Sequence, residues 1–178
     1  MCCLGGCASQ PHPNLAAMRA GWSDPRTRDL CQPFYDPDLI AVCDPPEGWK
    51  QDPTKKGWNN IHKVWLSPTR ETAYGVIHFS MPLPVGANLA LGGFLKEMKK
   101  TEGTANLLSK QDDPKLPGIR FVAEGGKYCI HAYLMVNGWQ GWAIYAGTLR
   151  GVADPPDELD MATRAREYTK VGRPDTGK

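Results

Sequence analysis

The dipeptide Asn137-Gly138 constrains the fold of this chain more than any other feature of its sequence. It lies between two segments rich in aromatic and apolar residues, Lys127–Val136 and Trp139–Leu149. Asn-Gly is the strongest short-range signal for a β-hairpin, because a type I′ turn needs positive φ at both central residues. A two-residue loop also fixes the strand register. The expected cross-strand pairs are Val136 with Trp139, Tyr133 with Trp142, His131 with Ile144 and Cys129 with Ala146.

The rest of the sequence predicts further strands and two helices around this hairpin. Apolar residues at helical spacing, with lysines on the opposite side, predict a helix over Leu89–Lys100 that stops before Gly103. A second helix is expected over Asp157–Lys170, where two prolines precede an acidic first turn. The expected strands are Leu39–Cys43, Asn60–Leu66, Thr72–Met81 and Gly118–Glu124, with a polar connector over Leu107–Pro117.

Length and composition predict one globular domain with tails. The chain has 178 residues, of which 41% are hydrophobic and 22% are charged, and such values are typical of a single compact unit. We expect one α+β domain over residues 31–172, a signal remnant and tether over 1–30, and a loose tail over 173–178.

The order of these elements resembles that of a known fold family. An early strand is followed by Pro46-Glu47-Gly48-Trp49, two strands, a helix, three strands with a tight hairpin, and a final helix. Over residues 39–170 this order is similar to PsbP, the extrinsic subunit of photosystem II, and its non-photosynthetic relatives. The resemblance implies an antiparallel sheet sandwiched between helices. The metal-binding and docking segments of the photosynthetic subunit have no recognisable counterpart, so a photosystem function is not implied.

The first residues contain a candidate lipidation site. Leu4-Gly5-Gly6-Cys7 resembles a bacterial lipobox, where a signal peptide is cut and the new N-terminal cysteine receives a lipid. Only six residues, none of them Lys or Arg, precede Cys7, so a complete secretory signal would have to be longer. Ala8–Pro13 has the composition of a tether. The alternative is a frayed terminus with incidental cysteines.

The lipobox predicts a cell-envelope protein, anchored by a lipid on Cys7 and facing the periplasm. In addition, Tyr145–Arg150 followed by Glu158-Leu159 and a helix resembles uncharacterised bacterial envelope lipoproteins. The expected partners are therefore the membrane, through the lipid, and an envelope protein.

Charge and hydropathy argue against nucleic-acid binding and against a membrane-spanning helix. The net charge is +2, and the basic residues are scattered rather than interleaved with aromatics in a stripe, so no nucleic-acid partner is expected. No apolar run approaches the roughly 20 residues of a membrane helix.

Three cysteines follow Cys7. An envelope location permits a disulfide, and Cys31 with Cys43 would close a short loop. Cys129 would then be a buried thiol in a strand. The alternative is that all three are reduced and buried.

The sequence contains no recognisable catalytic motif, and we expect no enzyme activity, cofactor or metal. His62, His78 and His131 all lie on expected strands, and the two-residue strand period places His131 and Cys129 on one face, which His78 could share. Isolated strand histidines are most often structural. No nucleophile elbow, metalloprotease motif, phosphate loop or dinucleotide fingerprint is present.

Tryptophans on or beside strands are the remaining functional candidates. Tyr133, Trp139 and Trp142 of the hairpin form the expected binding surface, because aromatic rings on a sheet can contact peptides or sugars. The sequence therefore predicts a non-enzymatic, lipid-anchored envelope protein that binds a partner. The alternative is a small-ligand-binding protein or enzyme with a pocket between the sheet and the helices.

Overall fold

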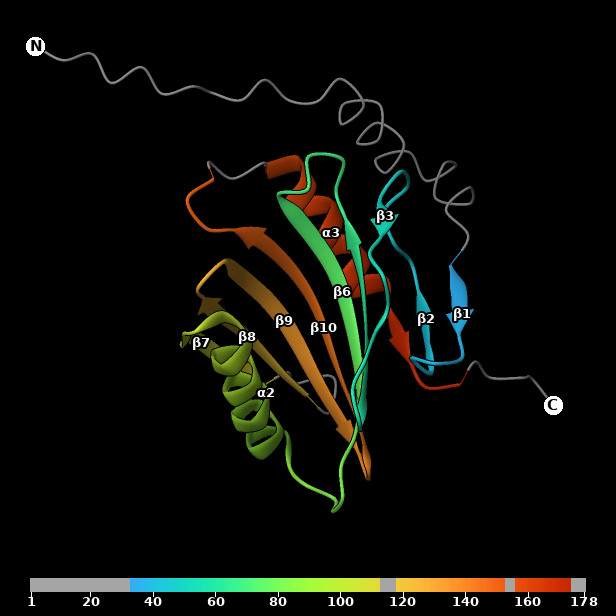
Figure 1. Ribbon diagram of the computed structural model, residues 1–178. Coiled ribbons are helices and arrows are strands. Elements are labelled where there is room, and N and C mark those ends of the chain that lie inside the picture. The colour runs from blue at the N-terminus through green and yellow to red at the C-terminus, as the bar shows by residue number, and fades with distance from the viewer. Residues whose placement is uncertain (1–32, 113–117, 153–155, 174–178) are drawn as a thin grey trace, which may run out of the picture.

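The computed structural model describes residues 33–112, 118–152 and 156–173. Its main feature is an antiparallel sheet in the order β3-β5-β6-β10-β9-β8-β7, with β4 paired to β5 (Figure 1). Its strands are β3 (Lys50–Gln51), β4 (Lys55–Lys56), β5 (Asn60–Leu66), β6 (Thr72–Ser80), β7 (Ala105–Asp112), β8 (Gly118–Gly125), β9 (Tyr128–Asn137) and β10 (Gln140–Leu149). A second sheet, in the order β1-β2-β11, consists of β1 (Phe34–Asp36), β2 (Ala41–Cys43) and β11 (Lys170–Val171).

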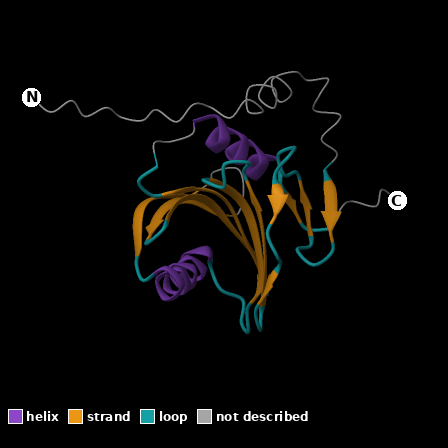
Figure 2. Cartoon of the chain, turned by 45° about the horizontal axis from the view of Figure 1, so that its top comes forward, coloured by secondary structure: helices purple, strands orange, loops and turns teal. Residues whose placement is uncertain are grey.

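Two helices pack on opposite faces of the main sheet. Figure 2 shows the sheet arching over α2 (Ala87–Glu102), while α3 (Pro156–Tyr168) lies on the outer side of the arch. The α2 helix ends where the sequence predicts, because Gly103 has a φ of 82° and its N–H donates to the carbonyl of Lys99. The acidic first turn predicted for α3 is also present.

Each face of the sheet has its own hydrophobic core. On the inner face, α2 buries Leu91 and Met98 against residues of β8, β9 and β10. On the outer face, α3 buries Met161, Ala162 and Ala165 against the other side of the sheet and the small β1-β2-β11 sheet. The alternation along the strands therefore sorts side chains into two cores, as expected for a sheet covered on both faces.

The predicted fold class is wrong. Of the described residues, 48% are in strands and 21% in helices, so this is a β-rich fold dominated by an antiparallel sheet, not a PsbP-like α+β sandwich of a sheet between helices. The difference arises largely from strands that sequence periodicity did not reveal. The expected connector begins within β7, and residues 34–36, for which no strand was expected, form β1. The two helices cover the large sheet only in part.

The hairpin exists, but its turn lies one residue further along the chain than predicted. Asn137 pairs with Gln140, so the two loop residues are Gly138 and Trp139. Gly138 has a φ of 59°, and Asn137 does not have a positive φ; glycine at the first central position is the pattern of a type II′ turn. The expected pairs are therefore wrong by two residues: Tyr133 pairs with Ile144, and Trp142 pairs with Met135.

Two glycines bring β6 and β10 together on the inner face. A Cβ on Gly75 would lie 2.2 Å from the Tyr145 ring, and a Cβ on Gly141 would lie 2.3 Å from the Phe79 ring. In the register of these neighbouring strands, Gly75 pairs directly with Tyr145, and Gly141 pairs directly with Phe79. Each aromatic ring thus lies over the glycine opposite to it, where any side chain would displace the ring.

Candidate functional site

Three turns at one end of the main sheet expose large apolar side chains. Trp58, in the β4–β5 turn, is 100% exposed, and Leu83, in the β6–α2 loop, is 65% exposed. Trp139, in the β9–β10 turn, is 53% exposed. We call these three residues the apolar tip. Together they leave on the order of a few hundred Å² of apolar surface in water, which is about the size of the largest apolar patch on a typical monomer, and such patches are often functional.

Hydrogen bonds between the three turns hold the tip together. The N–H of Ser80 donates to Asn59 O at 2.9 Å, and the Asn59 amide donates back to Ser80 O at 3.1 Å. The N–H of Met81 donates to Trp139 O at 2.8 Å. The tip is therefore a set of mutually bonded turns at the end of paired strands.

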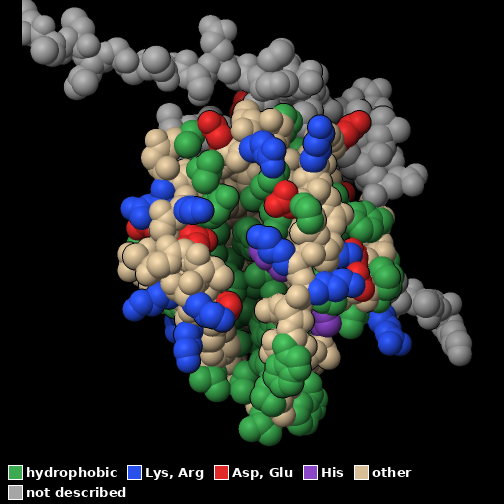
Figure 3. Space-filling view, viewed as in Figure 1, with side chains coloured by type: hydrophobic (Ala, Val, Ile, Leu, Met, Phe, Trp, Pro, Cys, Tyr) green, Lys and Arg blue, Asp and Glu red, His purple; other side chains and the backbone are tan. Residues whose placement is uncertain are grey.

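The apolar tip lies in the least charged part of the chain. No Asp, Glu, Lys or Arg occurs in residues 57–62, 72–95 or 128–149, the three segments that form and support it. Figure 3 shows hydrophobic side chains at the lower end of the molecule, with no charged side chain among them. A ligand for this surface must therefore be recognised by apolar contact rather than by charge.

The structure separates the three residues of the predicted binding surface, and that prediction is wrong for two of them. Trp139 is exposed at the tip, but Tyr133 and Trp142 are buried in the outer face of the sheet. Tyr133 belongs to the core beneath α3. The aromatic residues of the hairpin therefore divide between core and surface, and only Trp139 can contact a partner directly.

Trp142 is a packing residue that holds the turn between β1 and β2. Its indole Nε1 donates to Leu39 O at 2.8 Å, and its ring stacks on His78 with centroids 5.3 Å apart. His78 Nδ1 donates to Asp38 O at 3.1 Å, and its Nε2 faces the side-chain amide of Gln140. Both rings thus bind carbonyl groups of the same turn.

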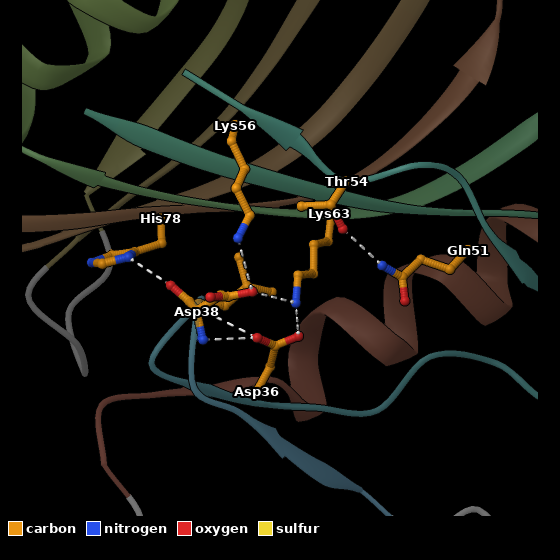
Figure 4. Close-up of polar contacts among 8 residues, drawn as sticks. Asp36, Asp38, Gln51, Thr54, Lys56, Lys63 and His78 are labelled. Carbon is orange, nitrogen blue, oxygen red and sulfur yellow. Dashed lines mark hydrogen bonds and ion pairs between the residues drawn. The ribbon is translucent and has the colours of Figure 1, made fainter. Parts of the chain in front are cut away.

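A charged cluster fastens that turn to the main sheet (Figure 4). Lys63 of β5 reaches Asp36 and Asp38, with its Nζ 2.5 Å from Asp36 Oδ2 and 3.2 Å from Asp38 Oδ2. Asp36 Oδ1 also accepts hydrogen bonds from the N–H groups of Asp38 and Leu39. Burial alone lowers the pKa of Lys63, but the hydrogen bonds and charges of the two aspartates outweigh it and raise that pKa. The lysine therefore stays charged and paired.

A second polar contact lies on the inner face. His62 Nε2 is 2.7 Å from the hydroxyl of Tyr145. Burial, followed by the charge of Lys55, lowers the pKa of His62 to about 4, while burial raises the pKa of Tyr145. Both groups are therefore neutral at pH 7, and the contact is a hydrogen bond between uncharged side chains.

The depressed pKa of His62 predicts that acid destabilises the fold. In the unfolded chain an ordinary histidine binds a proton near pH 6.5, so between about pH 6.5 and 4 the unfolded state binds more protons than the folded state. The contribution of His62 to stability is therefore complete above pH 6.5 and falls as the pH drops towards 4. Urea unfolding at pH 7 and pH 5 should show a smaller loss of stability for His62→Gln than for the wild type. An equal loss of stability in the wild type and in His62→Gln would contradict the lowered pKa of His62.

His131 and Cys129 line a hollow on the outer face. The strand alternation places them on that face with Glu124 and Thr148, each of which pairs with Cys129 across the sheet. These side chains and Arg150 line a hollow of about 400 Å³. Arg150 Nε lies 2.7 Å from Glu124 Oε1, so the Glu124 carboxylate is already paired with the Arg150 guanidinium. His78, expected as a possible companion, is held elsewhere by the β1–β2 turn. Within the described part of the chain, no three His, Cys, Asp or Glu side chains gather where a metal ion would bind.

The cysteine predictions are tested only in part. Cys43 carries a free thiol and is buried, whereas its expected disulfide partner Cys31 lies outside the described residues. Burial raises the pKa of the Cys43 thiol to about 12. Cys129 is half-buried rather than fully buried. The lipidation site Cys7 lies outside the described residues as well. Neither described helix is long and apolar enough to cross a membrane.

Comparisons with known proteins give this chain no family. No protein-family model matches it, and no curated protein is significantly similar. A crystal structure of a protein from Bacteroides thetaiotaomicron is similar, with a TM-score of 0.40 and 13% sequence identity, over 82% of this chain and 49% of that one. The chain thus spans about half the length of that protein.

The binding surface expected from the sequence lacks two of the three residues of the apolar tip, Trp58 and Leu83, although Trp58 is one of the tryptophans on or beside strands that the sequence offers as candidates. Trp58 follows Gly57 and precedes two asparagines, and Leu83 stands between Pro82 and Pro84. Both settings are typical of turns, where an apolar side chain has no strand or helix period to bury it. A large apolar residue enclosed by turn residues is the signal that could have identified them.

Proposed function

We propose that this protein is a non-enzymatic, lipid-anchored component of the bacterial cell envelope that binds a partner through its apolar tip. The observation that carries the proposal is the exposure of Trp58, Leu83 and Trp139 on three turns at one end of the sheet. Exposed apolar patches of this kind, without charge, are typical of interaction surfaces. The lipobox-like segment ending at Cys7 supports the location, because lipidation would hold the tip close to other envelope components.

Lipidation and binding are tested separately in cells. The gene, expressed with its natural upstream sequence in the presence of radioactive palmitate, should yield a labelled protein, and Cys7→Ser should abolish the label. A photo-crosslinking amino acid at position 58 or 83 should then attach the protein to an envelope component, lipid or protein, while the same group at exposed position 108 of β7 should not. Label that persists in Cys7→Ser, or equal crosslinking at all positions, would refute the proposal.

A second candidate function is small-ligand binding or catalysis at the hollow around Cys129 and His131. A volume of about 400 Å³ lined by Cys, His, Glu, Thr and Arg side chains favours it. The hollow is lined mainly by polar groups, and Glu124 and Arg150 are already paired with each other, whereas ligand pockets are mostly apolar with a few free polar groups. We therefore favour partner binding at the apolar tip over ligand binding or catalysis at this hollow.

A further inference from the structure

The apolar tip has the shape and chemistry of a surface that enters a lipid bilayer. We infer that Trp58, Leu83 and Trp139 insert into the interface of a phospholipid membrane and hold the sheet end-on to it. This inference rests on the proposed function, because it names the partner of the same tip. Four features of the described residues support a bilayer rather than a protein.

The first feature is the shape of the tip. Its side chains project from three turns, and two hollows in the described surface lie elsewhere, around His131. A protein partner would need a pocket matched to each projecting side chain, as at the buried anchors of protein interfaces. Fluid lipid needs no matching pocket, so the projecting shape favours a membrane.

The second feature is the choice of side chains. Tryptophan is enriched where a membrane meets water, because its ring is apolar and its indole N–H still reaches polar groups. Uncharged polar residues, Asn59, Asn60, Asn137 and Gln140, lie next to the tip in the same turns and strands. They can face headgroups without the penalty of moving a charge into lipid.

The third feature is the bonding of the backbone. An inserted turn brings peptide groups into a region with little water, where an unsatisfied group is costly. The bonds from Ser80 N to Asn59 O and from Met81 N to Trp139 O satisfy such groups within the tip. The tip can therefore enter the interface without leaving these groups unpaired.

The fourth feature is the position of the nearest basic residues. Lys55 and Lys56 are exposed on β4, three and two residues before Trp58, respectively. At about 3.3 Å per residue, their backbone lies roughly 7–10 Å from the tryptophan. That is the depth at which an inserted apolar surface meets lipid phosphates, so these lysines can lie at the headgroups while Trp58 lies below them.

A lipid on Cys7 is compatible with this orientation. Cys7 precedes Pro33, the first described residue, by 26 positions. A chain of this length spans at most about 90 Å, which exceeds the diameter of roughly 40 Å expected for a domain of this size. The anchor and the tip can therefore reach the same membrane whatever end of the domain faces it.

The test uses the 178-residue chain without its lipid, so that only the tip can bind. Cys7→Ser prevents lipidation, and Trp22→Phe removes a tryptophan outside the described residues. Trp49, Trp65 and Trp142 are buried, which leaves Trp58 and Trp139 as the reporters. The protein is mixed with phosphatidylcholine vesicles, with and without bromine on the acyl chains, and binding is measured by sedimentation and fluorescence.

We expect binding, a shift of tryptophan emission to shorter wavelength, and quenching by brominated lipid. Trp58→Ala with Trp139→Ala should lower the partition coefficient about 100-fold, or about tenfold for each side chain removed. Leu83→Ser should lower it about tenfold. The control is Leu108→Ser on β7, which should not change it, although Leu108 is 57% exposed and Leu83 is 65% exposed. Raising the salt from about 0.1 to 0.5 M should have little effect, because the tip carries no charge and phosphatidylcholine vesicles have no net charge to attract Lys55 and Lys56.

Three results would overturn the inference. The chain could fail to bind vesicles, its binding could survive removal of both tryptophans, or salt could abolish it. Unchanged melting temperatures of the variants confirm that they fold. If vesicles are not bound but the crosslinker at position 58 captures an envelope protein in cells, the inference fails and the proposed function stands. If neither lipid nor protein is captured, both fail.

Discussion

Asp36→Ala is expected to lower the free energy of unfolding by about 3–5 kcal/mol, because it leaves the largely buried Lys63 without its closest partner. The side chains of Asp36 and Lys63 are only 5% and 11% exposed. The substitution also removes the acceptor for the N–H groups of Asp38 and Leu39. Since most domains are stable by only 5–15 kcal/mol, urea denaturation should detect this loss easily.

Two further variants separate the charge from the turn. Asp36→Asn keeps an oxygen for the two backbone N–H groups but removes the charge that faces Lys63. Adding Lys63→Met to Asp36→Asn should recover stability, because an apolar side chain then replaces an unpaired buried charge. Lys100→Ala, which breaks an exposed pair with Glu97, should cost less than about 1 kcal/mol. A loss below 1 kcal/mol for Asp36→Ala would show that the cluster does not hold the turn.

The faces of the strands could be predicted from the sequence, but the turn position could not. Asn137-Gly138 favours a type I′ turn, whereas the chain turns at Gly138 and Trp139. In this position Trp139 O accepts a hydrogen bond from Met81, so contacts with the β6–α2 loop accompany the observed turn. The register moved by two residues, and a shift by two leaves every side chain on its predicted face. His131 and Cys129 therefore share a face, as predicted, although their partners differ.

The fold class could not be predicted because much of the strand content has no periodic signal. Strand β7 is exposed on nearly all its residues, so its sequence shows no alternation of apolar and polar side chains. In the small sheet, only β2 was expected, within Leu39–Cys43, whereas β1 and β11 have three and two residues, too few to show a period. Their pairing depends on long-range contacts such as Lys63 with Asp36.

Burial of individual tryptophans and acids also depends on tertiary structure. The sequence places Glu158 in the first turn of α3, where it suits the helix dipole. In the fold this carboxylate is fully buried and accepts a hydrogen bond from Thr69 of the β5–β6 turn. Likewise, sequence analysis grouped Trp139 and Trp142 as one surface, although one is exposed and the other is core.

Trp142→Ala is expected to destabilise the protein by about 3–5 kcal/mol, the range observed when a large buried aromatic side chain is removed. Trp142 is 5% exposed, and its indole donates to Leu39 O. Trp142→Phe keeps most of the packing but leaves that buried carbonyl without its donor, which should cost about 1–3 kcal/mol. Urea denaturation at neutral pH measures both losses.

Trp139→Ala is the matched control, because Trp139 lies three residues away on the same hairpin and is exposed. Its removal should change stability by no more than about 0.5 kcal/mol while weakening vesicle binding. Trp142→Ala should do the reverse, since the molecules that remain folded keep an intact tip. An equal loss of stability in both variants would mean that Trp139 is packed against the fold and is not available to a membrane. The two tryptophans thus allow stability and binding to be measured independently on one hairpin.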